Sequence, residues 1–324
     1  MSKQTLTADQ LQMLVADHEP LVGLDLEGGN YRAIDLRNAR FERVNARGAI
    51  FSQAHLDGCS WISSELSAAQ FDDCTFTDSM LTDCTLNGAS LLGARLDHGL
   101  WLRCCGNDLD LRKTRIKGLS VIESVFARAR FNEATMESSQ WDTCTLTDLQ
   151  TAQTRWSQTR FINCLLERAR FAAIVLHQCA FDRSTLTDAD FTGCDAQSAS
   201  FYQSQGQRVV FKGARLDKAI FSNAQMSGAD FTEASLNMAC LNNADLSDAM
   251  LSRASLEYAL CEELHAPKAS FIDANLNGAD FHGADLAHCD WRGANLDAIR
   301  PEDSERLAAQ RSEEHTSELQ SPVL

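Results

Sequence analysis

Residues 224–248 read AQMSG-ADFTE-ASLNM-ACLNN-ADLSD, five consecutive units of five residues. Each unit begins with Ala and carries Met, Phe or Leu two residues later. A period of five fits neither the 3.6-residue helix nor the two-residue alternation of a strand. It fits a solenoid in which each unit forms one side of a coil. The small first residue and the large third residue then point inward, and the other three face water.

The same frame extends outward from this stretch to residues 21 and 298. Its large positions have numbers that end in 1 or 6, and all 16 Phe and 5 Trp fall there. Aromatic residues fill 19 of the 28 positions that end in 1, but 3 of the 28 that end in 6. The complete repeat is therefore ten residues. A three-sided coil of 15 residues would scramble that alternation, whereas a four-sided coil of 20 residues preserves it. We therefore predict about 14 square coils, with one stacked strand spacing between them.

The A(D/N)LXX units resemble the pentapeptide repeat family, over residues 21 to about 298. The resemblance implies an all-β solenoid, a right-handed quadrilateral β-helix. It implies less about function, because one fold can carry many roles.

Both ends of the chain differ from the repeat. Residues 1–20 are predicted to hold a capping helix, since Thr7-Ala8-Asp9-Gln10 resembles a capping box. Residues 299–310 are predicted to start a C-terminal helix, with Pro301 and acidic residues in its first turn. Residues 311–321, RSEEHTSELQS, match a translation of a common short-read sequencing adapter residue for residue. We interpret residues 311–324 as an adapter artefact.

Composition narrows the function classes. Lys and Arg number 29 against 45 Asp and Glu, a formal net charge of −16, which disfavours direct binding of nucleic acid. The sequence has no apolar signal core and no run of about 18 apolar residues, so we expect a cytoplasmic protein without a membrane span. The 12 cysteines are then expected to be thiols.

The sequence offers no catalytic constellation. Nine cysteines fall at the small inward position, where Cys replaces Ala as a small buried residue: Cys59, Cys74, Cys84, Cys104, Cys144, Cys164, Cys179, Cys194 and Cys289. Nucleophile, zinc, phosphate-loop and dinucleotide motifs are missing from the sequence. We therefore predict a non-enzymatic protein with no catalytic residue, no cofactor and no metal.

Two surfaces are candidates for binding. Apolar residues at outward positions whose numbers differ by multiples of 20 predict one column, which Thr82, Asp142 and Asp182 interrupt, and Leu100 flanks it. The residues of this interaction surface are Ile62, Leu100, Leu102, Ile122, Ile162 and Tyr202. Such a stripe indicates a protein partner or a homodimer, although single apolar residues are also normal on surfaces.

The C-terminal third is acidic, with 12 acidic and 4 basic residues over 219–300. Its candidate surface is Asp230, Asp245, Asp280, Asp285 and Asp290. Two functional hypotheses follow. The first is a scaffold rod of a bacterial cell that binds an unknown protein partner, as an accessory of a secretion system. The alternative is a DNA mimic that binds gyrase or topoisomerase, as some members of the resembled family do.

Overall fold

The computed structural model describes residues 6–299, and the chain divides into two compact units, residues 1–170 and 171–324. The C-terminal helix expected from residue 299 onward and the segment 311–324 lie outside the described residues, apart from Ile299. Within residues 6–299, no helix is long and apolar enough to cross a bilayer.

Each unit is a parallel β-solenoid. Every backbone pairing joins residues 20 apart, from Leu21 with Phe41 in the first unit to Asn275 with Asn295 in the second. The spacing confirms the four-sided coil that the ten-residue alternation predicts. The frame holds throughout, since the inward positions are buried along both units except near the ends, where Leu24, Gly29 and Leu296 are half-buried.

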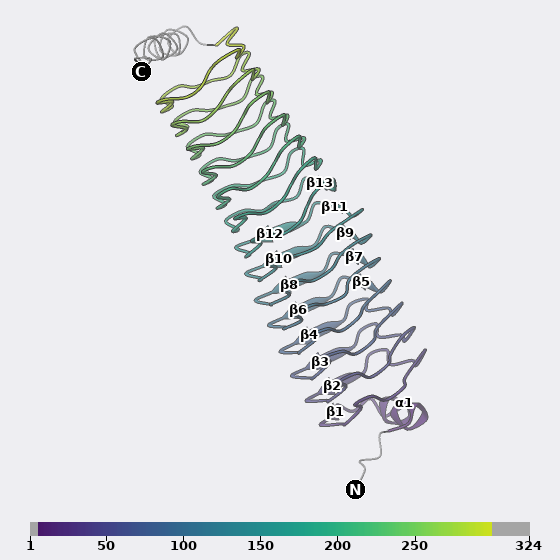
Figure 1. Cartoon of the computed structure of the whole chain (residues 1–324). Coiled ribbons are helices and arrows are strands. Elements are labelled where there is room, and N and C mark those ends of the chain that lie inside the picture. Colours follow the sequence, from purple (N-terminus) through teal and green to yellow (C-terminus); the bar gives the residue numbers. More distant parts are fainter. Residues whose placement is uncertain (1–5, 300–324) are drawn as a thin grey trace, which may run out of the picture. The chain divides into compact units, whose positions relative to one another are not determined.

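Two sides of the first unit carry strands of two or three residues, stacked one per coil (Figure 1). The larger sheet contains β1 (Leu21–Val22), β2 (Arg40–Glu42), β3 (Ser60–Ile62), β4 (Met80–Thr82), β6 (Leu100–Leu102), β8 (Ser120–Ile122), β10 (Gln140–Asp142) and β12 (Arg160–Ile162). The adjacent side contains β5 (Arg95–Asp97), β7 (Arg115–Lys117), β9 (Thr135–Glu137) and β11 (Arg155–Ser157).

The larger sheet has eight strands. One strand in each of the roughly 14 expected coils would have given more. The reason is local. The second unit begins with β13 (Val175–His177), and its later coils pair through single-residue bridges such as Ala180 with Ser200. Where a coil side turns after one bridged residue, three residues cannot align as a strand.

The corners of the coil share one backbone conformation. The residue two after each large inward residue has a positive φ, as at Asn243 (58°) and Gly228 (67°). On the bridged sides a hydrogen bond closes the turn, for example from Ala49 N to Ala46 O at 3.0 Å. A four-residue turn with a left-handed third residue favours Gly, Asn and Asp, which explains their frequency at these positions.

Aromatic rings stack along the inside of the second unit. Phe181, Phe201 and Phe221 form one stack, with ring centroids 5.2 and 4.8 Å apart. Phe191 and Phe211 stack on the opposite side at 4.9 Å. The two stacks meet edge to face at 5.2–5.6 Å, a favourable geometry for aromatic pairs. In a four-sided coil, the aromatic positions that end in 1 therefore fall on two opposite sides.

Two glycines occupy large inward positions for a steric reason. A Cβ added to Gly106 would lie 2.8 Å from the Phe126 ring, and one added to Gly206 would lie 2.5 Å from Met226 Sδ. A large residue in the next coil therefore fills the space that each glycine leaves, and the core stays closed.

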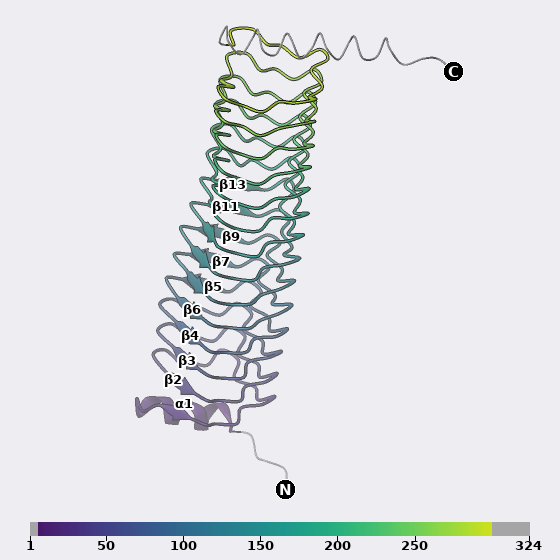
Figure 2. The ribbon, with the colours of Figure 1, turned by 90° about the vertical axis from the view of Figure 1, so that its left-hand side faces the viewer.

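Helix α1 (Ala8–Ala16) lies across the open end of the first coil (Figure 2). Gln10 N donates to Thr7 Oγ1 at 3.2 Å, and Thr7 N donates to Gln10 Oε1 at 2.9 Å, which completes a capping box. Leu11 is fully buried, and Tyr31 Oη donates to Leu6 O at 3.0 Å. The helix therefore covers strand edges that would otherwise be open to pairing.

Candidate interaction surfaces

The outer face of the larger sheet gathers four of the apolar residues singled out in the sequence. Strand pairing places Ile62 beside Thr82, Thr82 beside Leu102, and Leu102 beside Ile122. Leu100 lies on the same strand as Leu102, with the buried Trp101 between them. We call Ile62, Leu100, Leu102 and Ile122 the first-unit stripe. All four are exposed or half-buried, so the stripe is open to a partner.

The other two residues of the predicted column do not extend the stripe. Ile162 on β12 follows Asp142 in the register but is only 5% exposed, so its interpretation as a surface residue is wrong. Position in the repeat fixes the direction of a side chain, but the neighbouring side chains decide its exposure. Tyr202 is exposed in a turn of the second unit, outside this sheet.

Met80 is a residue that the sequence reasoning missed. It lies on β4, directly beside Leu100 in the register, and is half-buried. The signal was present, because Met80 and Leu100 also differ by 20. Only the column of Ile62 was followed in the sequence, not the outward column two residues before it.

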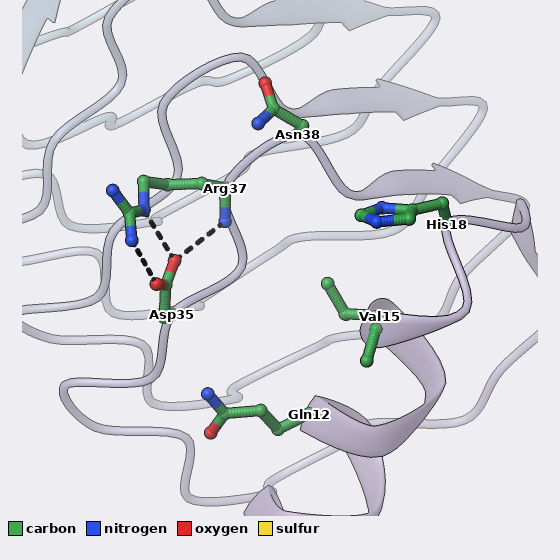
Figure 3. Close-up of a pocket in the computed structure, with 7 residues that line it drawn as sticks. Gln12, Val15, His18, Asp35, Arg37 and Asn38 are labelled. Carbon is green, nitrogen blue, oxygen red and sulfur yellow. Dashed lines mark hydrogen bonds and ion pairs between the residues drawn. The ribbon is translucent and has the colours of Figure 1, made fainter.

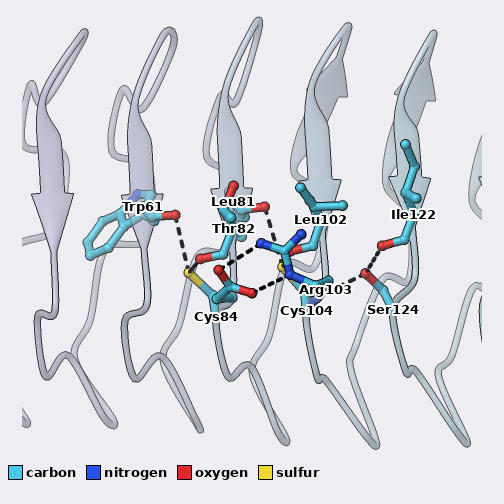
Figure 4. Close-up of polar contacts among 10 residues, drawn as sticks. Trp61, Leu81, Thr82, Cys84, Leu102, Arg103, Cys104, Ile122 and Ser124 are labelled. Carbon is cyan, nitrogen blue, oxygen red and sulfur yellow. Dashed lines mark hydrogen bonds and ion pairs between the residues drawn. The ribbon is translucent and has the colours of Figure 1, made fainter.

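Beneath the first-unit stripe runs an inward row of small polar side chains (Figure 4). Cys84 Sγ donates to Trp61 O at 3.3 Å, and Ser124 Oγ accepts from Cys104 N at 3.0 Å. Burial raises the pKa of the Cys84 thiol to about 11 and that of Cys104 to about 12. Both thiols are therefore protonated at neutral pH and cannot serve as nucleophiles there.

The nine cysteines expected at inward positions are all buried. Among them, Cys144 and Cys164 interact one coil apart. The hydrogen bond between their side chains lowers the pKa of Cys144 and raises that of Cys164. Each sulfur also lies 3.3–3.5 Å from backbone carbonyl oxygens. The pair is closed to solvent, since both residues are at most 1% exposed.

The structure does not bring the five candidate aspartates onto one surface. Two lie on one side of the second unit, two on a second side and one on a third, because their numbers fall in three different 20-residue columns. Each accepts the backbone N–H of the residue two positions later, at 2.8–3.2 Å: Asp230, Asp245, Asp280, Asp285 and Asp290. These carboxylates therefore stabilise turns.

Sequence reasoning also missed an apolar corner in the second unit. Ile220, Cys240 and Leu260 pair in one outward column. Met238 and Tyr258 lie on the turns two residues earlier and are among the most exposed large apolar side chains of the described residues. We call these five residues the second-unit corner. Their spacing of 20 was visible in the sequence, but the turn position was expected to be polar.

A cavity of about 280 Å³ lies between α1 and the coil that follows it (Figure 3). Its lining comprises Gln12, Val15, Ala16, His18, Asp35, Arg37 and Asn38. Arg37 binds Asp35 through Nε–Oδ1 and Nη2–Oδ2 contacts of 2.9 and 2.6 Å. The guanidinium lowers the pKa of Asp35 to about 2. Because the two charges neutralise each other, the Asp35 carboxylate stays ionised at neutral pH and does not act there as a proton donor.

Within residues 6–299, no cluster of three His, Cys, Asp or Glu side chains has a geometry that could hold a metal ion.

Known families match this sequence along both units. A region described as pentapeptide repeat matches residues 184–260, and pentapeptide repeats (8 copies) match residues 21–60, 64–98, 249–286 and 274–298. Among curated proteins, none matches the sequence significantly.

Several solved structures are similar. HetL of Nostoc sp., a pentapeptide repeat protein involved in regulating heterocyst differentiation, is 20% identical, with 90% of this chain and 98% of that chain covered and a TM-score of 0.21. QnrB1, a plasmid-mediated fluoroquinolone resistance protein, is 14% identical, with 61% and 97% covered and a TM-score of 0.38. A pentapeptide repeat protein of the Arabidopsis thaliana thylakoid lumen is 28% identical, with 38% and 71% covered and a TM-score of 0.24. TM-scores this low carry no argument about function.

Proposed function

The chain belongs to the pentapeptide repeat family, and from this premise we propose that it is a non-enzymatic protein whose solenoid surface binds other proteins. The first-unit stripe is the observation that carries the proposal. Ile62, Leu102 and Ile122 lie in register on the outer face of a sheet, with Thr82 between the first two. A cluster of apolar residues on an otherwise polar surface is typical of a protein-binding site.

The border of the stripe supports the same proposal. Arg103 binds Asp83 one coil earlier, through Nε–Oδ1 and Nη2–Oδ2 contacts of 2.7 and 2.9 Å. A fixed bidentate pair beside an apolar face gives a polar rim around an apolar centre, which is the usual anatomy of an interface. The thiols and hydroxyls beneath the stripe form hydrogen bonds with backbone groups. The thiols of Cys84 and Cys104 are protonated and therefore supply no nucleophile.

The narrower role we propose is that of a cytoplasmic scaffold in bacteria, accessory to a secretion system. The test uses the tagged full chain in its native host, with quantitative mass spectrometry of bound proteins. The Leu102→Ser/Ile122→Ser double variant should lose secretion-system components at least tenfold. Val125→Ser, an exposed apolar position on the next side of the coil, is the matched control and should retain them. If the double variant retains every specific partner, the stripe is not the binding site.

A second candidate function is DNA mimicry toward gyrase or topoisomerase. The charge of the second unit favours it, because residues 171–299 hold 17 Asp and Glu against 8 Lys and Arg. The engagement of the five aspartates in turns weighs against it, since their carboxylates are spread over three sides. A supercoiling assay with purified gyrase distinguishes the two functions. Inhibition that Glu262→Gln/Glu263→Gln relieves supports mimicry, and unchanged supercoiling at micromolar protein rejects it.

A further inference from the structure

The second-unit corner concentrates exposed apolar side chains where two sides of the coil meet. Ile220, Cys240 and Leu260 are bridged in register, one per coil. Met238 and Tyr258 precede two of them by two residues, and each is 55% exposed. Leu260 and Ile220 are 45% and 42% exposed. Four large apolar side chains thus share one corner, whereas isolated apolar residues are the norm on a surface.

Backbone conformation does not account for Met and Tyr at this corner. Met238 and Tyr258 have φ values of 58° and 55°, in the left-handed region that favours Gly, Asn and Asp. One coil later the same turn position holds Gly278, and a Cβ there would come within 2.6 Å of the Tyr258 ring. The Tyr258 ring therefore lies over Gly278. The opposite face of the ring is open to solvent. These two side chains add apolar area without a gain in turn stability.

The rim of the corner is mainly acidic, although Lys218 precedes Ile220 by two residues. Glu257 precedes Tyr258, Glu262 follows Leu260 by two residues, and Asp280 pairs with Leu260 in the register. The second unit as a whole carries 17 acidic against 8 basic residues over 171–299. Two copies of the corner facing each other would juxtapose like charges, which disfavours self-association. Charge complementarity selects a partner with Lys and Arg beside its apolar contact.

The spacing of the corner fits a helix. Stacked bridges are about 4.8 Å apart, so the column from Ile220 to Leu260 spans about 10 Å. Side chains at i, i+3 or i+4 on a helix surface lie about 5–6 Å apart. An apolar helix stripe of two turns therefore matches the length of the column.

We propose that the second-unit corner binds an amphipathic helix of a partner protein, with the apolar stripe of the helix on Ile220, Met238, Tyr258 and Leu260 and its Lys and Arg residues against the acidic rim. This rests on the proposed function, protein binding, and adds the chemistry of the partner and a second surface.

The test measures binding of a fluorescent synthetic peptide to the full chain by anisotropy. The probe is an 18-residue amphipathic helix with a Leu stripe bordered by Lys. Met238→Ser/Tyr258→Ser should weaken its binding at least tenfold, because the apolar contact is lost. Met250→Ser, at an exposed Met (45%) on another side of the coil, is the matched control and should change binding less than twofold. Glu257→Gln/Glu262→Gln should weaken binding severalfold and reduce its dependence on salt.

Two comparison peptides separate apolar from electrostatic recognition. One keeps the Leu stripe with Glu borders, and the other keeps the Lys borders with a Ser stripe; both should bind at least tenfold more weakly than the probe. If the Ser-stripe peptide bound as tightly as the probe, net charge alone would explain the binding, and the proposal would be overturned. An equal loss in Met250→Ser would also overturn it. So would a dimer seen by sedimentation that Met238→Ser/Tyr258→Ser dissociates, because a second copy would then be the occupant.

Failure of the helix-binding proposal is distinguishable from failure of the proposed function. The Leu102→Ser/Ile122→Ser variant alters only the first-unit stripe, so its effect on partners in the host is independent of the peptide. Loss of host partners in that variant, without peptide binding at the second-unit corner, would reject the helix proposal alone.

Discussion

The hydroxyl of Ser124 accepts the backbone N–H of Cys104, one coil earlier, at an N–Oγ distance of 3.0 Å. Ser124 Oγ in turn donates to Ile122 O at 2.8 Å. The same exchange joins Val44 N to Ser64 Oγ and Leu119 N to Ser139 Oγ, at 3.1 and 3.2 Å. On the bridged sides the corresponding N–H closes a turn instead. The hydroxyl therefore replaces the turn hydrogen bond where a side carries a three-residue strand.

Replacing Ser124 by Ala should lower the free energy of unfolding by about 1–3 kcal/mol, because the buried Cys104 N–H loses its acceptor. Urea unfolding followed by circular dichroism measures the change. Ser60→Ala is the matched control, since Ser60 lies on the outer face of β3 and is half-buried, and it should change stability by less than about 0.5 kcal/mol. Equal effects of the two variants would show that the hydroxyl is not needed.

This relationship marks where sequence reasoning fell short. The inward position was predicted to need a small residue, and burial of the nine cysteines agrees with that. Its polar requirement was not predicted. Yet the inward row behind strands β3 to β12 of the larger sheet reads Ser64, Cys84, Cys104, Ser124, Cys144 and Cys164, with no Ala among them. Behind β1 and β2 the same position holds Leu24 and Val44. The bridged sides mostly hold Ala. The signal was in the sequence, but its meaning depends on turn geometry, which five-residue periodicity does not encode.

The frame predicted direction more reliably than exposure. Every large position ending in 1 or 6 points inward because the coil has no other way to bury it. An outward position such as Ile162 is covered or open according to its neighbours, and no repeat rule specifies those. The same limit applied to Met238 and Tyr258, whose turn position was expected to be polar.

Substituting Gly106 by Ala should destabilise the first unit by about 1–3 kcal/mol, because the new Cβ would lie 2.8 Å from the Phe126 ring. Phe126→Leu removes the ring edge and should make the same Gly106→Ala change nearly neutral. A double-mutant cycle by chemical denaturation measures this coupling. Additive effects would contradict the steric explanation for a glycine at a large inward position.

Thr7→Ala should loosen helix α1 without unfolding the coils. The substitution removes the Oγ1 acceptor of Gln10 N, and loss of such a cap costs about 1 kcal/mol. Hydrogen exchange should quicken at Leu11 and its neighbours in α1, while amides of β3 and β4 keep their protection. Thr7→Ser retains the acceptor and is the conservative control. Faster exchange throughout the first unit would instead mean that α1 supports the whole unit.

Buried thiols make the free energy of unfolding depend on pH in the alkaline range. Burial raises the pKa of the Cys59 and Cys74 thiols to about 12, whereas an unfolded chain has thiols near their ordinary value of about 8.5. Between these values the unfolded state loses protons that the folded state keeps, so the free energy of unfolding falls as pH rises. At pH 10 the loss is about 1–2 kcal/mol for each thiol, and below about pH 8 it vanishes.

Urea unfolding of Cys59→Ala/Cys74→Ala at pH 7 and pH 10 tests this dependence. The double variant is destabilised at both pH values, because Cys59 Sγ no longer donates to Leu36 O and Cys74 Sγ no longer donates to Phe51 O. That loss cancels in the difference between the two pH values, which should shrink by about 2–4 kcal/mol relative to the unmodified chain. Cys105→Ala is the control, since Cys105 is half-exposed on the outer surface. An undiminished pH difference in the double variant would mean that other groups cause the alkaline loss of stability.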